Sequence, residues 1–162
     1  MDIALVKNLP IALIFLPAAD IPTFVSQGRV DLGITGWDQV QEHDAAIRAL
    51  NIDGASEMVM ELGFGSCKLQ VQVPEKGTFA STQDLVGQTI GTSFVHLATQ
   101  YFARLESGGS TEVPEGYKLK TKIIELSGSV EAACALGVAA GIVDLVGTLF
   151  DRSSSVRLGL PR

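Results

Sequence analysis

Residues 67–73 (CKLQVQV) decide the fold class, because their apolar and polar side chains alternate strictly. A period of two places Leu69, Val71 and Val73 on one face of a β-strand and the polar side chains on the other. One apolar and one polar face indicate an antiparallel or half-exposed strand. Pro74 lacks the N–H group that a sheet requires, so we expect the strand to end there.

Short apolar strands alternate with helical patterns on both sides of this stretch. Before it, we expect strands at 11–16 and 30–34, helices at 20–28 and 36–43, and a loop at 44–57. After it, we expect strands at 87–93, 122–126 and 141–146, helices at 97–105 and 129–136, and a loop at 107–117. The run at 11–16 is apolar throughout, which is typical of a strand covered on both faces. The alternation predicts an α/β fold.

The order of these elements indicates two lobes joined by the alternating strand. We expect a first α/β lobe at 1–73, with 67–73 as a crossover strand, and a second lobe at 74–150. The last twelve residues, 151–162, carry three basic residues and one acidic residue and show no hydrophobic period. We expect them to be an atypical tail that packs little.

Composition excludes several classes of protein. The chain has 162 residues, of which 46% are hydrophobic and 19% charged, so it is not intrinsically disordered. A net charge of −6 argues against a nucleic-acid-binding protein. The longest apolar run, 11–16, is too short to span a membrane, and no basic secretion signal opens the chain. Two cysteines far apart favour a reducing compartment, so we expect a soluble cytoplasmic protein.

Familiar catalytic motifs are absent from the sequence. There is no GxxxxGK[ST], no GxGxxG after a strand and no GxSxG. His43 and His96 lie too far apart in the chain to suggest a zinc motif, and both fit ordinary surface or helix positions. Cys67 and Cys134 are interpreted as small buried hydrophobic residues rather than as reactive thiols.

Three strand ends are candidate ligand sites, each with a simpler interpretation. Residues 31–36 (DLGITG) could bring backbone close to an anion, or form a plain strand-to-helix turn. Residues 127–131 (SGSVE) offer hydroxyl groups and free N–H groups, with Glu131 as a ligand for Mg²⁺ or a ribose hydroxyl, or simply as an acid in the first turn of a helix. Thr92 and Ser93 suit an anion or a helix cap. Trp37 suits base stacking or packing.

Read together, these segments resemble the catalytic domain of the ATP phosphoribosyltransferase family, especially its fungal form. The segments that carry the likeness, in family-like order, are 16–38, 65–69, 86–94, 127–131 and 141–146. The resemblance implies a fold like the type II periplasmic binding proteins, with two α/β lobes and a substrate cleft between them. It also implies that the chain corresponds to this domain truncated at both ends, so we expect the fold to be incomplete.

The family resemblance implies the first reaction of histidine biosynthesis. N1 of the ATP adenine attacks C1′ of phosphoribosyl pyrophosphate, and pyrophosphate leaves with the help of Mg²⁺. Such chemistry depends on positioning and charge stabilisation, so no nucleophile or base is expected among the residues. The partners implied are ATP and phosphoribosyl pyrophosphate, not nucleic acid or a membrane, and the full-length form is a possible homo-oligomer.

The same resemblance assigns two sets of binding residues. The phosphoribosyl pyrophosphate and Mg²⁺ set, with Glu131 as the metal ligand, is Ser127, Gly128, Ser129, Val130, Glu131, Asp144 and Thr148. The ATP set is Asp31, Gly33, Thr35, Gly36, Lys68, Thr92 and Ser93. We expect segments 31–36 and 127–131 to face each other across the cleft. The chain departs from the family after residues 144–146, where GTLF replaces the expected Gly-x-Thr phosphate loop.

Two other functions remain open from the sequence alone. The chain could be a small-anion-binding module of the same architecture that performs no chemistry. It could also be an inactive fragment that associates with a full-length subunit. A phosphoribosyl transfer assay separates the enzyme from both, and copurification with a full-length subunit separates the two alternatives.

Overall fold

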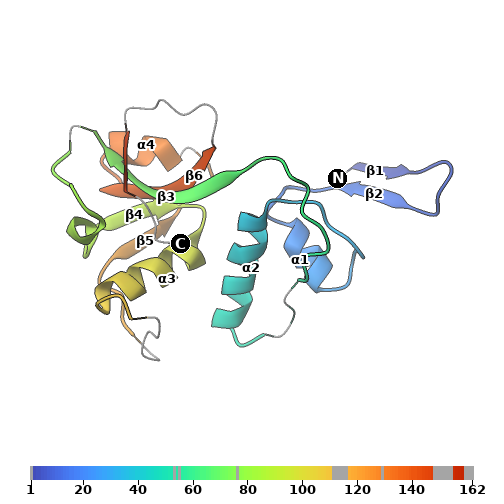
Figure 1. Ribbon diagram of the computed structural model, residues 1–162, viewed down its shortest axis with the longest axis horizontal. Helices are drawn as coiled ribbons and strands as arrows, with labels where there is room; N and C mark the ends of the chain where they lie inside the picture. The colour runs from blue at the N-terminus through green and yellow to red at the C-terminus, as the bar shows by residue number, and fades with distance from the viewer. Residues whose placement is uncertain are drawn as a thin grey trace. The chain divides into compact units, whose positions relative to one another are not determined.

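The computed structural model describes residues 2–52, 54, 56–75, 77–110, 117–128 and 130–147, together with strand 155–158. It consists of two compact units, Met1–Glu61 and Leu62–Arg162, which are described separately below (Figure 1). Both units contain helices and strands, which confirms the α/β class. None of the helices in the described part of the chain has the length and apolar character needed to cross a bilayer.

The second unit is built on a mixed five-stranded sheet. Its strands, in spatial order, are β5 (Lys122–Glu125), β4 (Thr89–Thr92), β6 (Gly141–Gly147), β3 (Cys67–Pro74) and β7 (Ser155–Leu158). Strands β5 and β6 run parallel to β4, whereas β3 runs antiparallel to β6 and ends at Pro74, as its alternating pattern predicts. The strand therefore lies inside the sheet of the second unit, whereas we expected it to complete a first lobe that ended at residue 73.

Helices cover both faces of this sheet, as Figure 1 shows for α3 (Val95–Glu106) and α4 (Val130–Ala135). Phe102 of α3 packs in a core cluster with Val71 and Val143, on one face. On the other face, residues of α4 pack with Ile142. Successive residues of β6 thus point to opposite helices, which is the geometry of a strand buried on both sides. The helical period predicted for 97–105 is confirmed, and the short 3-10 helix η1 (Thr82–Leu85) precedes β4.

A single carboxylate fastens the C-terminal end of α3 to the segment before β5. Glu106 accepts hydrogen bonds from the Tyr117 hydroxyl (3.1 Å), the Lys120 N–H (2.8 Å), and both the N–H (2.8 Å) and hydroxyl (2.6 Å) of Thr121. Partial burial raises the pKa of Glu106, but these hydrogen bonds outweigh it and hold the pKa below its usual 4.5. The ionised form is therefore the one that the fold stabilises.

We expect the second unit to lose stability in acid through Glu106. Because its folded pKa is lowered, the stabilisation is fully present above the unfolded value of about 4.5 and is lost as the pH falls through the folded pKa. The Glu106→Gln variant should be less stable at pH 7 and should show a flatter decline below pH ~4.5. Urea unfolding at several pH values measures this. Parallel wild-type and variant curves across the acid range would contradict it.

The first unit contains a β-hairpin and two helices. Strands β1 (Asp2–Leu5) and β2 (Ala12–Phe15) pair antiparallel, and α1 (Ile21–Ser26) and α2 (Trp37–Ala49) follow. Pro22 lies in the first turn of α1, and Gly28, just beyond the helix, has a φ of +64°, which suit a helix start and a helix stop, respectively. Gly33 passes so close to α1 that a Cβ would lie 2.5 Å from Ile21 Cγ2.

Three expectations for the first unit are wrong. Strand β2 is exposed rather than covered on both faces, because only β1 pairs with it and no described helix packs over it. Residues 30–34 form no strand, since none of the described strands hydrogen-bonds to them and a strand without a partner is not stable. Helix α2 continues to Ala49 instead of ending at 43, because Asp44 and Ala45 are buried and good helix formers follow.

The tail also differs from expectation in one respect. Within residues 151–162, Ser155–Leu158 form strand β7, which pairs antiparallel with β3 at Val71 to Pro74. The prediction that this segment packs little is therefore wrong for its backbone. Without β7, β3 would be an edge strand with unpaired N–H and C=O groups, and such an edge accepts a strand whatever the strand's hydrophobic period.

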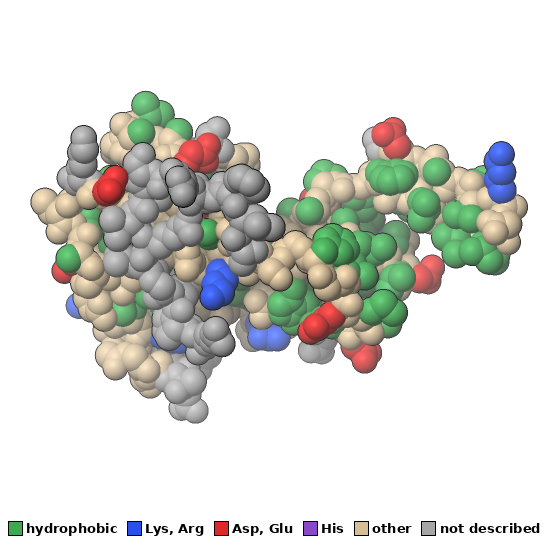
Figure 2. Space-filling model, turned by 45° about the horizontal axis from the view of Figure 1, so that its top comes forward, with side chains coloured by type: hydrophobic (Ala, Val, Ile, Leu, Met, Phe, Trp, Pro, Cys, Tyr) green, Lys and Arg blue, Asp and Glu red, His purple; other side chains and the backbone are tan. Residues whose placement is uncertain are grey.

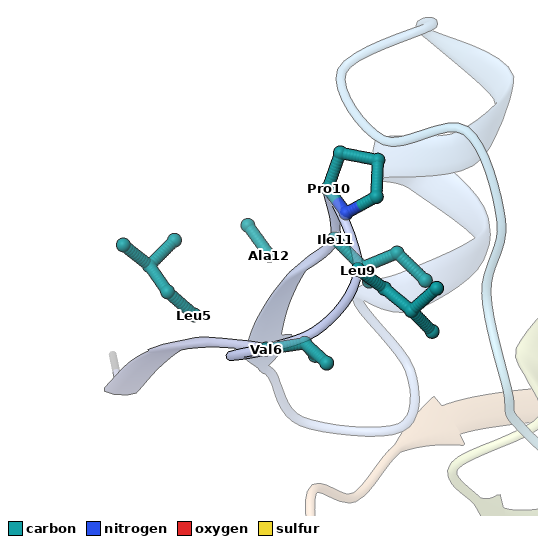
Figure 3. Close-up of a pocket in the computed structure, with 6 residues that line it drawn as sticks. All are labelled: Leu5, Val6, Leu9, Pro10, Ile11 and Ala12. Carbon is teal, nitrogen blue, oxygen red and sulfur yellow. The ribbon is translucent and has the colours of Figure 1, made fainter.

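Apolar side chains gather on the surface of the first unit (Figure 2). In the hairpin, Leu5 is 80% and Phe15 is 62% exposed. A shallow hollow of about 330 Å³ lies at the bend of the hairpin, lined by Leu5, Val6, Leu9, Pro10, Ile11 and Ala12 (Figure 3). All of the lining side chains are apolar, so the hollow offers no charged or polar side chain for a nucleotide or a phosphate.

Candidate functional site

The three polar strand ends of the second unit lie at one edge of its sheet. Strand β4 ends at Thr92, which is opposite Glu125 of β5 on one side and Val143 of β6 on the other. Because these strands are parallel, their carboxyl ends share an edge, which is where open α/β sheets bind ligands. Ser93, the 127–128 turn and Asp144 each lie just past that row of residues. The sequence predicts separate candidate sites at 92–93 and 127–131, and the structure places them at the same edge of one sheet.

Strand β3 brings a cation to the same edge. Its first residues pair with the last residues of β6, Cys67 with Gly147 and Lys68 with Val146. The β3–β6 ladder therefore extends beyond the end of β4, and Lys68 lies on this extension with an exposed side chain. Cys67 is also exposed, so the expectation that it is buried is wrong; an extension past the neighbouring strands leaves it uncovered.

Thr92, by contrast, has a structural role. Its side chain is fully buried, its hydroxyl donates to the Val143 carbonyl (2.7 Å) and it accepts from the Phe94 N–H (2.9 Å). Both bonds hold the end of β4 against β6 and the start of α3. This supports the capping interpretation of Thr92, and it leaves Ser93, which is exposed, as the member of the pair accessible to a ligand.

We expect Thr92→Val to destabilise the second unit by about 1–3 kcal/mol, because the buried Phe94 N–H loses its acceptor. The shape of the side chain is nearly kept, so packing changes little. Ser93→Ala is the control, since its exposed side chain should change stability by less than about 0.5 kcal/mol. Urea unfolding measures both. If the Thr92→Val variant is as stable as the wild type, the hydroxyl of Thr92 does not have the structural role described above.

The 127–131 segment presents backbone and carboxylate groups rather than a pocket. Ser127 and Gly128 are exposed, and Gly128 has a φ of +125°, which only glycine adopts readily. Val130 is buried in the cluster under α4, so only its backbone is available to a ligand. Glu131 is exposed in the first turn of α4. Ser129 and Thr148, both predicted for this site, lie outside the described residues.

Asp144 and the polar face of β3 contain a feature that sequence reasoning missed. Asp144 is half-buried and accepts a hydrogen bond from the Leu145 N–H (2.8 Å). It pairs directly with Gln70 of β3, on the face where Gln72 is buried. The polar face of β3 is therefore covered at Gln70 and Gln72 and exposed only at Lys68, which the alternating pattern cannot reveal. Gln70 can be identified only from the register of β3 against β6, which places it opposite Asp144.

In the first unit, residues 31–36 form an irregular connection that leads from α1 into α2. Asp31 is exposed, and the Thr35 hydroxyl donates to the Ala18 carbonyl (2.9 Å). Gly36 precedes the first residue of α2, with Asp38 in the first turn. The simpler interpretation, a strand-to-helix turn, is wrong in that no strand precedes the helix. A role in ATP binding stays a prediction, as does the approach of this segment to 127–131. Trp37 is 45% exposed.

The remaining candidates do not form a metal site or a nucleophile. The described part of the chain contains no group of three or more His, Cys, Asp and Glu side chains placed to hold a metal ion. His43 is half-buried in α2, with Nε2 3.3 Å from the Ser26 hydroxyl and Nδ1 3.7 Å from Asp44 Oδ1. Burial raises the pKa of the Cys134 thiol, which disfavours the reactive thiolate.

Comparison with known proteins decides the family. The family described as "HisG: ATP phosphoribosyltransferase" matches residues 17–149. The chain belongs to the ATP phosphoribosyltransferase family. ATP phosphoribosyltransferase of Schizosaccharomyces pombe is 55% identical over 146 residues, covering 90% of this chain and 46% of the relative. That of Saccharomyces cerevisiae is 53% identical over 146 residues, covering 90% and 44%. The chain thus spans less than half the length of these relatives.

A solved structure supports the fold of this ATP phosphoribosyltransferase family member. This chain is similar to the ATP phosphoribosyl transferase (HisG:HisZ) complex from Thermotoga maritima, with a TM-score of 0.59 and 22% sequence identity. The match covers 85% of this chain and 55% of the Thermotoga maritima chain. At this identity the likeness concerns the fold alone. The family resemblance expected from the sequence is confirmed, including its fungal character.

Proposed function

We propose that the chain contributes catalytic-domain residues to an ATP phosphoribosyltransferase, which joins N1 of ATP to C1′ of phosphoribosyl pyrophosphate in histidine biosynthesis. Family membership supports the reaction class. The observation that carries the proposal is the shared sheet edge, where the ends of β4, β5 and β6 and the start of β3 present exposed polar groups together. A direct displacement needs positioning and charge stabilisation rather than a covalent intermediate, and polar groups gathered at one sheet edge suit that requirement.

The proposed roles divide between the two substrates. For the phosphoribosyl group, the exposed 127–128 turn would donate backbone N–H and hydroxyl hydrogen bonds to phosphate oxygens, and Asp144 would accept from ribose hydroxyls. For ATP, Lys68 would neutralise phosphate charge and Ser93 would donate a hydrogen bond. For residues 31–36 of the first unit, a contact with ATP stays a prediction from the sequence.

Mg²⁺ fits this edge only as a companion of the substrate. Mg²⁺ retains several waters and commonly binds one or two carboxylates together with substrate phosphates. The exposed carboxylate of Glu131 meets that need, whereas the described residues hold no larger ligand cluster. Bound there, Mg²⁺ would offset the charge of the departing pyrophosphate. We further propose a cytoplasmic location and assembly of the full-length form into oligomers, which size-exclusion chromatography of that form would test.

Direct titration of the 162-residue chain tests the proposal. We expect the 162-residue chain to bind both ATP and Mg²⁺–phosphoribosyl pyrophosphate, as measured by calorimetry. We expect the full-length form to produce phosphoribosyl-ATP when both substrates are present. A chain that binds an anion such as pyrophosphate but neither substrate selectively would be a simple anion-binding module. Binding of neither substrate would overturn the proposal.

Removing the cation of the sheet edge should weaken ATP binding. We expect Lys68→Ala to reduce ATP affinity by about tenfold or more, because a charge-assisted contact to phosphate contributes about 1.5–3 kcal/mol. Lys122→Ala is the matched control. Lys122 is also exposed, but it is the first residue of β5 and lies at the amino ends of the parallel strands, away from the candidate site. If both variants lose the same affinity for ATP, the effect comes from the overall charge of the protein, and Lys68 does not contact ATP.

A further inference from the structure

Gln70 carries a buried side-chain oxygen for which the described residues of the second unit supply no partner. Its side-chain Oε1 is shielded from solvent and has no hydrogen-bond partner within the described residues. The neighbouring Gln72 of the same strand, by contrast, does take part in an interaction. A buried amide oxygen without a partner costs free energy that a leucine at the same place would not, so the fold gains nothing from this amide.

The position of Gln70 connects it to the proposed substrate edge. Val71 lies opposite Val143, the residue level with the end of β4, and Gln70 and Asp144 form the next pair outward. Directly opposite residues of an antiparallel pair have Cβ atoms about 4.5–5.5 Å apart and point to the same face. The amide of Gln70 and the carboxylate of Asp144 are thus neighbours, on the face of the sheet that carries α4.

An amide beside a carboxylate suits a sugar better than a phosphate. A carboxylate only accepts hydrogen bonds and repels a phosphate, whereas a hydroxyl can donate to it. The amide both donates and accepts, as each hydroxyl of a vicinal diol does. A site built to hydrogen-bond a hydroxyl rejects an analogue that lacks the hydroxyl, because the buried polar atoms of the site are then left unpaired.

We propose that Gln70, together with Asp144, binds the ribose hydroxyls of the phosphoribosyl substrate and makes the site select ribose over 2-deoxyribose. This rests on the proposed function, and it adds a specificity-determining residue to it. In the absence of sugar the Gln70 Oε1 has no hydrogen-bond partner among the described residues, and in the complex a ribose hydroxyl would donate to it.

Three small probes and two variants test this proposal on the 162-residue chain. The probes are ribose 5-phosphate, 2-deoxyribose 5-phosphate and pyrophosphate, each titrated by calorimetry. The variant is Gln70→Leu, and the control is Gln88→Leu, an exposed glutamine just before β4, at the opposite edge of the sheet. The melting temperature of each protein is measured alongside, because a structural role and a binding role predict opposite changes.

We expect the wild type and Gln88→Leu to prefer ribose 5-phosphate over the deoxy sugar by about tenfold, the effect of one lost hydrogen bond. Gln70→Leu should lose that preference, keep its affinity for pyrophosphate, and melt at the same or a higher temperature. Retained preference in Gln70→Leu would overturn the proposal, as would a lower melting temperature with equal loss for both sugars. Wild-type binding without sugar discrimination overturns the role of Gln70 alone, whereas failure to bind any probe overturns the proposed function as well.

Discussion

Phe102→Ala is expected to destabilise the second unit by about 3–5 kcal/mol, the range for removing a large aromatic side chain from a core. Phe102 of α3 is fully buried, packs with Val71 and Val143 of the central strands, and meets the Tyr101 ring edge-on at 5.3 Å. Truncation leaves a cavity in the contact between α3 and the sheet. A loss of this size approaches the total stability of a small domain, so a molten or unfolded unit is the expected state.

Phe64→Ala is the matched control, because this phenylalanine is 76% exposed and its removal should change stability by less than about 0.5 kcal/mol. Urea unfolding followed by tyrosine fluorescence and far-ultraviolet circular dichroism measures both variants. If Phe102→Ala unfolds at the wild-type urea concentration, α3 does not provide the core that we describe.

Gly141→Val should destabilise the sheet by about 1–3 kcal/mol or more through overpacking. A Cβ at Gly141 would lie 3.2 Å from the Gln72 carbonyl oxygen and 3.3 Å from Leu85 Cδ1, and valine adds two methyl groups to that space. The first of these neighbours is backbone in the last pair of the β3–β6 ladder, so it cannot rotate away as a side chain can.

Gly147 offers the control within the same strand. No atom lies within 4 Å of a Cβ at Gly147, and valine favours strands, so Gly147→Val should be neutral or slightly stabilising. Thermal unfolding compares the two. Equal melting temperatures for both variants would show that β6 does not pack against Leu85 and β3 as closely as described.

The sequence predicts the second unit well because each of its elements is stabilised by regular burial. Residues 67–73 alternate because one face contacts the core around Phe102, and the apolar face of 97–105 has the helical period for the same reason. The first unit is predicted poorly. Residues 30–34 have the composition of a strand, but a strand depends on pairing, and composition does not report whether a partner is present.

The candidate site is predicted in part for a related reason. Motifs point to the ends of strands, so Ser93 and the 127–131 segment are found by pattern. The role of Thr92 is not found, because a threonine that holds two strands together has the same composition as one that binds a ligand. Gln70 is missed because its importance comes from register with Asp144, a pairing between residues distant in sequence.

The pairing of β3 with β6 has a consequence for how the protein is made. Strand β3 begins the second unit, yet its described neighbours in the sheet are β6 and β7, which are translated after β4 and β5. On the ribosome, β3 must wait with its hydrogen-bonding edges unoccupied until nearly the whole unit has emerged. Such long-range pairing folds slowly and leaves strand edges open to association. Nascent chains of this protein are therefore expected to depend on chaperones until β6 has emerged from the exit tunnel.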